Sequence, residues 1–207
     1  MIVVHHLENS RSQRVLWLLE ELGLPYEVRR YERDGKTMLA PPELRRVHPL
    51  GKSPAIEDDG RIIAESGAIV EYLVEKAEGR LGPPANRDSV LRYRHFLHYA
   101  EGSMMPLLFA LLVVNRLGIL GRPARAPIQK MLDQHLDWLE TELASRAWFA
   151  GNEFTAADIM MSFPLEASRS RAGLGTGRPN LIDWLERIHA RPAYAEALAK
   201  GGPYAYA

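Results

Sequence analysis

The chain has 207 residues, of which 46% are apolar and none is cysteine, and its 26 basic side chains balance 26 acidic ones. This length and apolar content allow one large or two small domains with a substantial core. The absence of cysteine excludes a disulfide framework, a cysteine-ligated metal and a cysteine nucleophile. The neutral charge balance gives no indication of a nucleic-acid partner.

The N-terminus, MIVVHHLENS, lacks the basic start and long apolar core of a signal peptide. The longest apolar stretch, residues 106–114, is too short to span a bilayer. We therefore expect a cytoplasmic protein without a membrane partner.

Strand and helix patterns alternate over residues 1–78. The expected elements are a strand over 2–7, a helix over 14–22 ended by Gly23, a strand over 26–31, a short helical or irregular piece over 41–47, strands at 55–56 and 61–64 around an Asp-Asp-Gly turn, and a helix over 66–76 with Ile69, Tyr72 and Leu73 inward. The order β-α-β-α-β-β-α predicts a small mixed sheet with a right-handed crossover.

A linker rich in glycine and proline, GRLGPPANR over residues 79–87, separates this half from an all-helical one. The expected elements beyond it are a long helix over 88–115, a loop over 118–127, helices over 128–143, 155–167 and 180–190, and a short last turn over 194–200. The positions expected to face inward on the helix over 128–143 are Met131, Leu132, His135, Leu136 and Leu139. We therefore predict an α/β domain over 1–78 and an all-α domain over 88–207.

The helix over 155–167 has a clear start signal. Thr155 is an N-cap residue, and Asp158 follows it at the third helical position, which is the spacing of a capping box. We assign this pair a role in folding and none in catalysis.

Several motifs together resemble the glutathione transferases. They are GKSPAI at 51–56 with Pro54 opening the third strand, Glu65-Ser66, the segment 154–159, NSRSQRVLWLLEE at 9–21 and HYAEGSMMP at 98–106. The resemblance covers nearly the whole chain, and the last two motifs are similar to a serine-type subgroup of bacteria and fungi. It implies a thioredoxin-like N-terminal domain with a cis-proline, an all-helical C-terminal domain, glutathione as co-substrate and a homodimer.

The resemblance also implies where glutathione binds. The backbone of Ser53, before Pro54, would pair with the cysteinyl unit, as an added strand does. Glu65 would meet the γ-glutamyl ammonium, and Ser66 with the following helix N-terminus would bind the γ-glutamyl carboxylate. Lys52 would lie near the glycine carboxylate. The alternatives are an ordinary turn proline, a plain helix cap and a solvated lysine.

The reacting thiol needs a hydrogen-bond donor, because a free thiol has a pKa of ~8.5 and is mostly protonated at neutral pH. A hydrogen bond to a charged group is worth roughly 1.5–3 kcal/mol, which lowers a thiol pKa by ~1–2 units. Ser10, four residues before Arg14, fits the serine-type pattern best. Ser12 is the alternative donor or the helix N-cap, and Asn9 is a possible amide donor.

The acceptor substrate is expected in a pocket between the two domains. The candidate lining residues on the long helix are Tyr99, Met104, Met105 and Phe109. Methionine is adaptable and suits apolar electrophiles, although a methionine at helical spacing is also typical of a core. His5 and His6 are neighbours on a strand and point to opposite faces, so we predict no metal site.

The sequence therefore predicts a glutathione transferase whose bound thiolate attacks electrophilic small molecules, with hydroperoxide reduction as a further activity. A glutathione-dependent isomerase or dehalogenase is an alternative. A non-catalytic binding or regulatory protein with the same fold is another.

Overall fold

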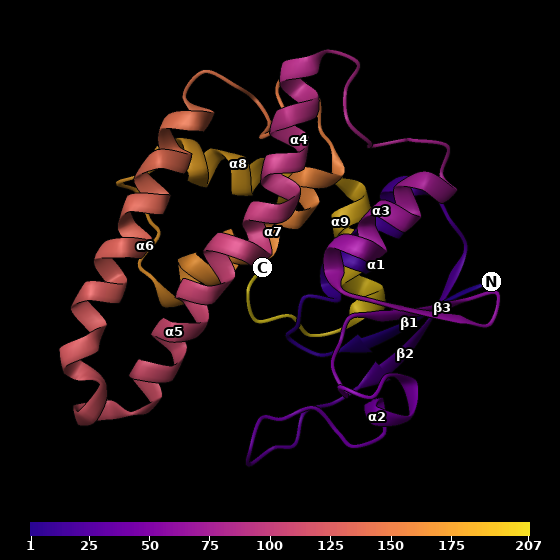
Figure 1. Ribbon diagram of the computed structural model, residues 1–207, viewed down its shortest axis with the longest axis horizontal. Coiled ribbons are helices and arrows are strands. Elements are labelled where there is room, and N and C mark those ends of the chain that lie inside the picture. Colours follow the sequence, from indigo (N-terminus) through magenta and orange to yellow (C-terminus); the bar gives the residue numbers. More distant parts are fainter. The chain divides into compact units, whose positions relative to one another are not determined.

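The computed structural model describes all 207 residues, and the chain folds into two compact units. The first unit comprises Met1–Gly82 and His189–Ala205 with Ala207, and the second comprises Pro83–Ile188 with Tyr206. The elements, coloured along the chain in Figure 1, are β1 (Ile2–Leu7), α1 (Gln13–Leu22), β2 (Tyr26–Tyr31), α2 (Leu44–Val47), β3 (Ala55–Asp58), β4 (Arg61–Ala64), α3 (Ser66–Lys76), α4 (Arg87–Tyr99), the π-helical turn η1 (Ala100–Met104), α5 (Met105–Arg116), the 3-10 turn η2 (Gly118–Gly121), α6 (Arg122–Leu143), α7 (Ala156–Arg171), α8 (Pro179–His189) and α9 (Pro192–Gly201).

The predicted fold class, a thioredoxin-like α/β domain followed by an all-helical one, is confirmed. Apart from small shifts at their ends, most predicted strands and helices are confirmed as well. The domain boundaries at 1–78 and 88–207 stay a prediction. The two compact units are defined by packing within the chain, and α9 belongs to the first of them.

The first unit is built on a four-stranded mixed sheet with the strand order β2-β1-β3-β4. β1 is parallel to β2 and antiparallel to β3, and β3 is antiparallel to β4. The register places His5 opposite Ala55, and Ala55 opposite Ala64. The end of β1, the start of β3 and the end of β4 therefore lie at the same end of the sheet.

Asp58, which ends β3, ties α3 to the sheet. The carboxylate is 1% exposed, with Lys76 Nζ at 2.7 Å, and it accepts a 2.8 Å hydrogen bond from the Tyr72 hydroxyl. Burial opposes ionisation, but these two partners hold the pKa of Asp58 below its usual value. Ile69 and Leu73 are buried as predicted, whereas Tyr72 is only half-buried because its hydroxyl reaches this carboxylate.

The last helix, α9, packs on α1 within the first unit. Arg191 forms a 2.5 Å ion pair with Glu21 on α1. The short last turn predicted over residues 194–200 lies within α9, which is longer than predicted, with ten residues that begin at Pro192. Proline is accommodated there because the first helical N–H groups have no intrahelical acceptor.

The second unit contains a long helix, Arg87–Arg116, interrupted by the π-helical turn η1. By length and composition this helix could cross a membrane, since one window reaches a mean hydropathy of 1.5, and 39% of that window is buried. The core helix of a soluble protein passes the same test, so the property by itself decides nothing.

The loop predicted over residues 118–127 is wrong. The chain forms η2 and then enters α6 at Arg122. Pro123 occupies the first turn, where no N–H is needed, and the helix continues through Pro127, which removes a single backbone hydrogen bond. Met131, predicted to face inward, is exposed. The remaining positions predicted to face inward on this helix are Leu132, Leu136 and Leu139, which are buried, and His135, which is half-buried.

The predicted capping box begins α7 and is confirmed. The Thr155 hydroxyl accepts the N–H of Asp158, and the Asp158 carboxylate accepts the N–H of Thr155 at 3.0 Å. The other carboxylate oxygen accepts the N–H of Phe149 at 3.0 Å and the indole N–H of Trp184 at 3.3 Å. All four residues are buried, so this carboxylate joins the start of α7 to the preceding loop and to α8.

Candidate active site

Three segments converge at one end of the sheet in the first unit. Residues 8–12 follow β1, Ser53 and Pro54 precede β3, and Glu65 with Ser66 follows β4. The topology thus brings together the residues that the sequence predicts for the glutathione half of the site. The register of the strands alone produces this convergence.

Ser53 holds its loop against β1. Its hydroxyl donates to the carbonyl of His5 at 2.8 Å and accepts the N–H of Leu7 at 3.3 Å. The Ser53–Pro54 peptide bond is cis, as the resemblance implies, and Pro54 is buried. The serine side chain is therefore engaged within the chain, which leaves the backbone as the group to consider for ligand contact.

Glu65 and Ser66 differ sharply in environment. Glu65 is exposed and has a φ of 72°, a conformation that costs a non-glycine residue about 1–3 kcal/mol and that concentrates at functional sites. Ser66 is buried at the start of α3, and its hydroxyl accepts a 3.2 Å hydrogen bond from the Arg14 guanidinium. Because Arg14 donates this bond, the hydroxyl proton of Ser66 stays available to an acceptor.

Ser10 and Ser12 lie in one hydrogen-bonded cluster with His6, which we call the serine cluster. The two hydroxyl oxygens are 2.8 Å apart, and Ser10 Oγ also accepts the N–H of Ser12 at 3.2 Å. Ser12 Oγ lies 2.9 Å from His6 Nδ1, and it accepts the N–H of Leu7 at 3.2 Å. Ser12 is fully buried and Ser10 is 6% exposed.

The protonation state of His6 determines the direction of the hydrogen bonds in the serine cluster. Burial, aided by the charge of Arg30, lowers the pKa of His6 to about 4, so the ring is neutral at physiological pH. The ring donates a hydrogen bond to the backbone carbonyl of Gly201. Its proton is therefore on Nε2, and Nδ1 is an acceptor. The Ser12 hydroxyl then donates to His6 Nδ1 or to the carbonyl of Leu7, which lies 3.3 Å away. With the Ser12 proton used in either way, the Ser10 hydroxyl donates to Ser12 Oγ.

The two remaining candidates on this side of the site are Asn9 and Lys52. Asn9 has a φ of 49°, and its side-chain oxygen accepts the N–H of Ala205 at 2.7 Å. Lys52 is exposed. Within the first unit, two residues near the C-terminus thus contact this side of the candidate site. Ala205 bonds to Asn9, and Gly201 accepts a hydrogen bond from His6.

The four residues predicted for the acceptor pocket all lie in the second unit, in different environments. Met104 is completely buried and Met105 is 5% exposed, whereas Phe109 is exposed. The Tyr99 hydroxyl contacts His135 Nδ1, and burial raises the pKa of Tyr99. Tyr99 lines a pocket of about 360 Å³ whose other lining residues are His95, Gln134, His135 and Trp138.

Sequence reasoning missed two residues of the site. The sequence suggests His6 only as a metal ligand, and its position on a strand argues against that role. Its strand parity with Ile2 and Val4 predicts burial, but no sequence signal indicates that Ser12 faces it. Arg14 was used only to locate the serine, and its contact with Ser66 spans 52 positions of the chain. No group of three or more histidine, aspartate or glutamate side chains is arranged to hold a metal ion.

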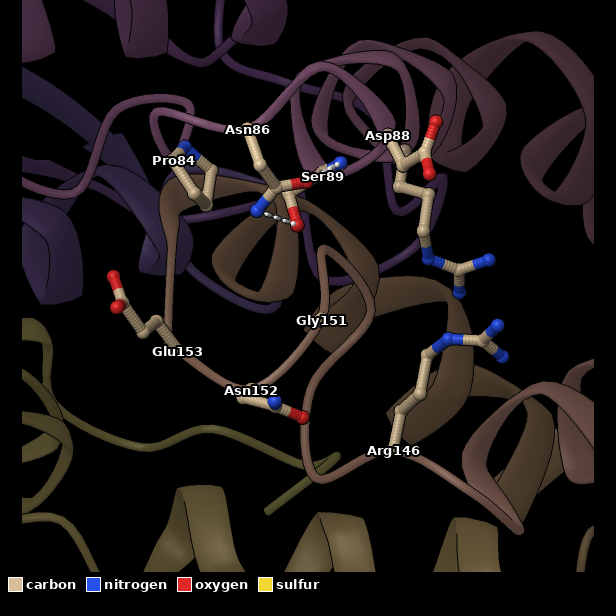
Figure 2. A pocket seen from close by; sticks show the side chains of 9 residues that line it. Pro84, Asn86, Asp88, Ser89, Arg146, Gly151, Asn152 and Glu153 are labelled. Carbon is tan, nitrogen blue, oxygen red and sulfur yellow. Dashed lines mark hydrogen bonds between the residues drawn. The ribbon is translucent and has the colours of Figure 1, made fainter.

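A further pocket of about 320 Å³ lies in the second unit around the start of α4 (Figure 2). Asn86 caps the helix by accepting the N–H of Ser89 at 2.8 Å. Arg92 and Arg146, which line the pocket, lie 2.6 and 3.7 Å from the same carboxylate of Glu142. These groups pair with one another, so we assign the pocket no part in the reaction.

Comparisons with known proteins agree with this geometry. Residues 10–76 match the family described as "Glutathione S-transferase, N-terminal domain", and residues 122–187 match "Glutathione S-transferase, C-terminal domain". The chain is 38% identical to Glutathione S-transferase 3 of Schizosaccharomyces pombe, over 97% of this chain and 88% of that protein. The chain belongs to the glutathione S-transferase family.

Two solved structures resemble this transferase. A glutathione S-transferase from Actinobacillus pleuropneumoniae is 33% identical, with a TM-score of 0.88 over 97% of this chain and 93% of that one. A glutathione transferase family member from Pseudomonas fluorescens, solved with two glutathione molecules bound, is 28% identical. Its TM-score is 0.79, over 95% of this chain and 92% of that one.

Proposed function

We propose that this transferase binds glutathione where β1, β3 and β4 converge and activates the thiol through the hydroxyl of Ser10. The observation that carries the proposal is the direction of the serine cluster. The Ser12 proton is held inside the protein, by His6 Nδ1 or by the Leu7 carbonyl, so Ser12 cannot donate to a ligand without breaking that bond. The Ser10 proton is held only by Ser12 Oγ, and rotation about one bond redirects it.

Activation follows from this rotation. Ser10 turns its O–H toward the glutathione sulfur while its oxygen continues to accept the N–H of Ser12. A hydrogen bond to a charged group is worth roughly 1.5–3 kcal/mol, and one pKa unit corresponds to about 1.36 kcal/mol. The thiol pKa therefore falls from ~8.5 to about 7. The N-terminus of α1 adds a favourable dipole.

The bound thiolate is then the nucleophile. Its sulfur forms a bond to an electrophilic carbon of the second substrate, and the leaving group departs with the electron pair of the bond that breaks. The protein stabilises the glutathione thiolate and orients it, and the electrophile carries the bond that breaks. Reduction of an organic hydroperoxide by the same thiolate remains a second activity of this proposal.

The γ-glutamyl end of glutathione carries an ammonium and a carboxylate. We assign the ammonium to exposed Glu65 and the carboxylate to the Ser66 hydroxyl with the first N–H groups of α3. The strained φ of Glu65 and the donor capacity of Ser66 support this assignment. The backbone of Ser53 before Pro54 would meet the cysteinyl unit, and Lys52 the glycine carboxylate.

The acceptor substrate is an apolar electrophile. Among the residues predicted to bind it, Phe109 offers exposed apolar area, and Tyr99 has a hydroxyl whose pKa is raised by burial. Met104 and Met105 are buried and would act by shaping the helix that carries Phe109. A homodimer and a cytoplasmic location complete the proposal. Analytical ultracentrifugation and cell fractionation test these two expectations.

The decisive experiment compares Ser10→Ala with its matched control Ser12→Ala. Ultraviolet difference absorbance of bound glutathione across pH gives the thiol pKa in each protein. For Ser10→Ala we expect the bound thiol pKa to return to ~8.5 and kcat/KM with an activated aryl chloride to fall about 10- to 100-fold. For Ser12→Ala we expect a smaller shift, because the donor remains.

Calorimetric titration with glutathione separates activation from binding. Ser10→Ala should keep its glutathione affinity, whereas Glu65→Ala should weaken it about tenfold, as expected for loss of a charge-assisted hydrogen bond worth roughly 1.5–3 kcal/mol. A thiol pKa that is unchanged in Ser10→Ala would exclude Ser10 as the donor. Glutathione binding without any lowered thiol pKa in the unmodified protein would favour the non-catalytic alternative.

A further inference from the structure

The turn between α5 and α6 exposes three large aliphatic side chains within four residues. Leu117 is 53% exposed, Ile119 is 76% exposed and Leu120 is 83% exposed. A single exposed leucine is ordinary, but neighbouring ones on one turn form an apolar patch, and such patches mark interaction sites. Figure 1 shows this turn at the free end of the α5–α6 hairpin in the second unit.

Two glycines give this turn a fixed shape. Gly118 has a φ of 58°, which favours glycine. Gly121 is buried, and a Cβ atom placed there would lie 1.9 Å from the carbonyl oxygen of Val114. No other residue fits that position without moving the backbone. The apolar side chains are therefore presented by a tightly closed turn.

The charge around the turn is one-sided. No aspartate or glutamate occurs from residue 102 to residue 132, whereas four basic residues do, namely Arg116, Arg122, Arg125 and Lys130. The whole chain is neutral, with 26 basic and 26 acidic residues, so this is a local excess. Its potential attracts anions to the end of the hairpin.

Beside the turn lies a pocket of about 490 Å³ that three arginines line. Arg122 and Arg125 come from the first turns of α6, and Arg171 comes from the last turn of α7. No carboxylate lines this pocket. The nearest acid along α6, Asp133, is already 3.1 Å from the guanidinium of Arg178. The first N–H groups of α6 add their dipole on the same side.

We propose that this turn and pocket form a docking surface for a membrane that contains anionic phospholipids. The lipid phosphate would occupy the arginine-lined pocket, and Leu117, Ile119 and Leu120 would enter the interfacial region of the bilayer. Aliphatic side chains next to basic ones are the combination that binds such surfaces peripherally. No helix crosses the bilayer in this arrangement.

Two observations favour a bilayer over other occupants. A soluble phosphate compound would use the arginines but leaves the aliphatic side chains in water. A protein partner would need a groove that accepts a convex turn, whereas a fluid lipid interface accepts it without a preformed shape. The surface shares no residue with the glutathione site, since every residue in it belongs to the second unit.

The test is co-sedimentation of the full chain with phosphatidylcholine vesicles, with and without phosphatidylserine. We expect binding only to the anionic vesicles, with loss at high salt because the charges are exposed. Each basic residue near such a surface is worth about 1 kcal/mol, which is about fivefold in partitioning. Arg122→Gln with Arg125→Gln should therefore lower partitioning roughly 25-fold, and Ile119→Glu with Leu120→Glu at least as much.

Two matched controls replace exposed residues elsewhere, Arg87→Gln for charge and Leu39→Glu for apolar area. Both should bind as the unmodified protein does, and circular dichroism checks that every variant is folded. Equal loss of binding in the controls, equal binding to neutral vesicles, or no binding at low salt would overturn the proposal. Binding of inorganic phosphate in a calorimetric titration, without any vesicle binding, would overturn the proposal and reassign the pocket to a soluble anion. Vesicle binding as described would overturn the expectation, made from the sequence, that the protein has no membrane partner.

Discussion

Two buried polar clusters stand at the starts of two helices, and they differ in how their hydrogen bonds are arranged. The serine cluster of His6, Ser10 and Ser12 precedes α1, and a second cluster, which we call the capping cluster, joins Thr155 and Asp158 at α7. In the capping cluster each carboxylate oxygen accepts hydrogen bonds from surrounding donors. In the serine cluster the last hydroxyl can release its proton from Ser12 by turning.

The difference shows how buried polar groups divide between folding and chemistry. The Asp158 carboxylate has its acceptor capacity used within the fold, so removing it breaks structure. The serine cluster is neutral and directional, and in the proposed function it keeps one donor for a ligand. Burial alone does not distinguish them, because Ser12 and Asp158 are both fully buried. The two clusters are distinguished by the direction of their hydrogen bonds.

The largest expected effect is the loss of the capping carboxylate. Asp158→Ala removes the acceptor for the N–H groups of Phe149 and Thr155 and for the Trp184 indole. Each unsatisfied buried donor costs about 1–3 kcal/mol, so the free energy of unfolding should fall by more than about 3 kcal/mol. Urea denaturation measures this change. Asp183→Ala, at an exposed acid on α8, is the control and should change little; equal losses in the two variants would contradict the comparison.

The second-largest expected effect is a loss of stability at acidic pH. His6 has a folded pKa of about 4, against an ordinary value of 6.5, so on acidification the unfolded chain binds the proton first. Stability is therefore lost as the pH falls from 6.5 towards 4, by about 2 kcal/mol at pH 5 from this residue. His6→Asn cannot titrate and should lose about that much less between pH 7 and pH 5. Identical pH profiles of the free energy of unfolding would show that His6 is not held neutral.

The sequence predicted most of what local pattern controls. A β-rich run predicted β1, helical spacing predicted α1 and α3, and the pair Thr155 and Asp158 predicted the start of α7. Pro123 and Pro127 misled the prediction of α6, because proline in the first turns of a helix leaves the same local signal as proline in a loop. Met131 was misplaced because the inward face of a helix depends on what packs against it.

The sequence predicts which residues form the candidate site, and their roles stay a prediction, but it does not predict how they connect. Ser10, Ser53, Pro54, Glu65 and Ser66 come together because the register of three strands places their segments at one end of the sheet. The His6 ring was not predicted to join them, because its contacts with Ser12 and Gly201 are set by the packing of α9 on α1. Hydrogen-bond direction depends on that packing, and no local pattern encodes it.

The smallest effect isolates the contact between the two serines. Their hydroxyl oxygens are 2.8 Å apart and both side chains are buried, so the single variants Ser10→Ala and Ser12→Ala should not be additive in the free energy of unfolding. We expect a coupling energy of about 1 kcal/mol from the double-mutant cycle, which is the usual size for one neutral hydrogen bond. The sharper test repeats the cycle with saturating glutathione. If Ser10 then donates to the thiolate, its bond to Ser12 is broken and the coupling should fall toward zero. A coupling that glutathione leaves unchanged would mean that the Ser10 hydroxyl stays turned toward Ser12 in the complex.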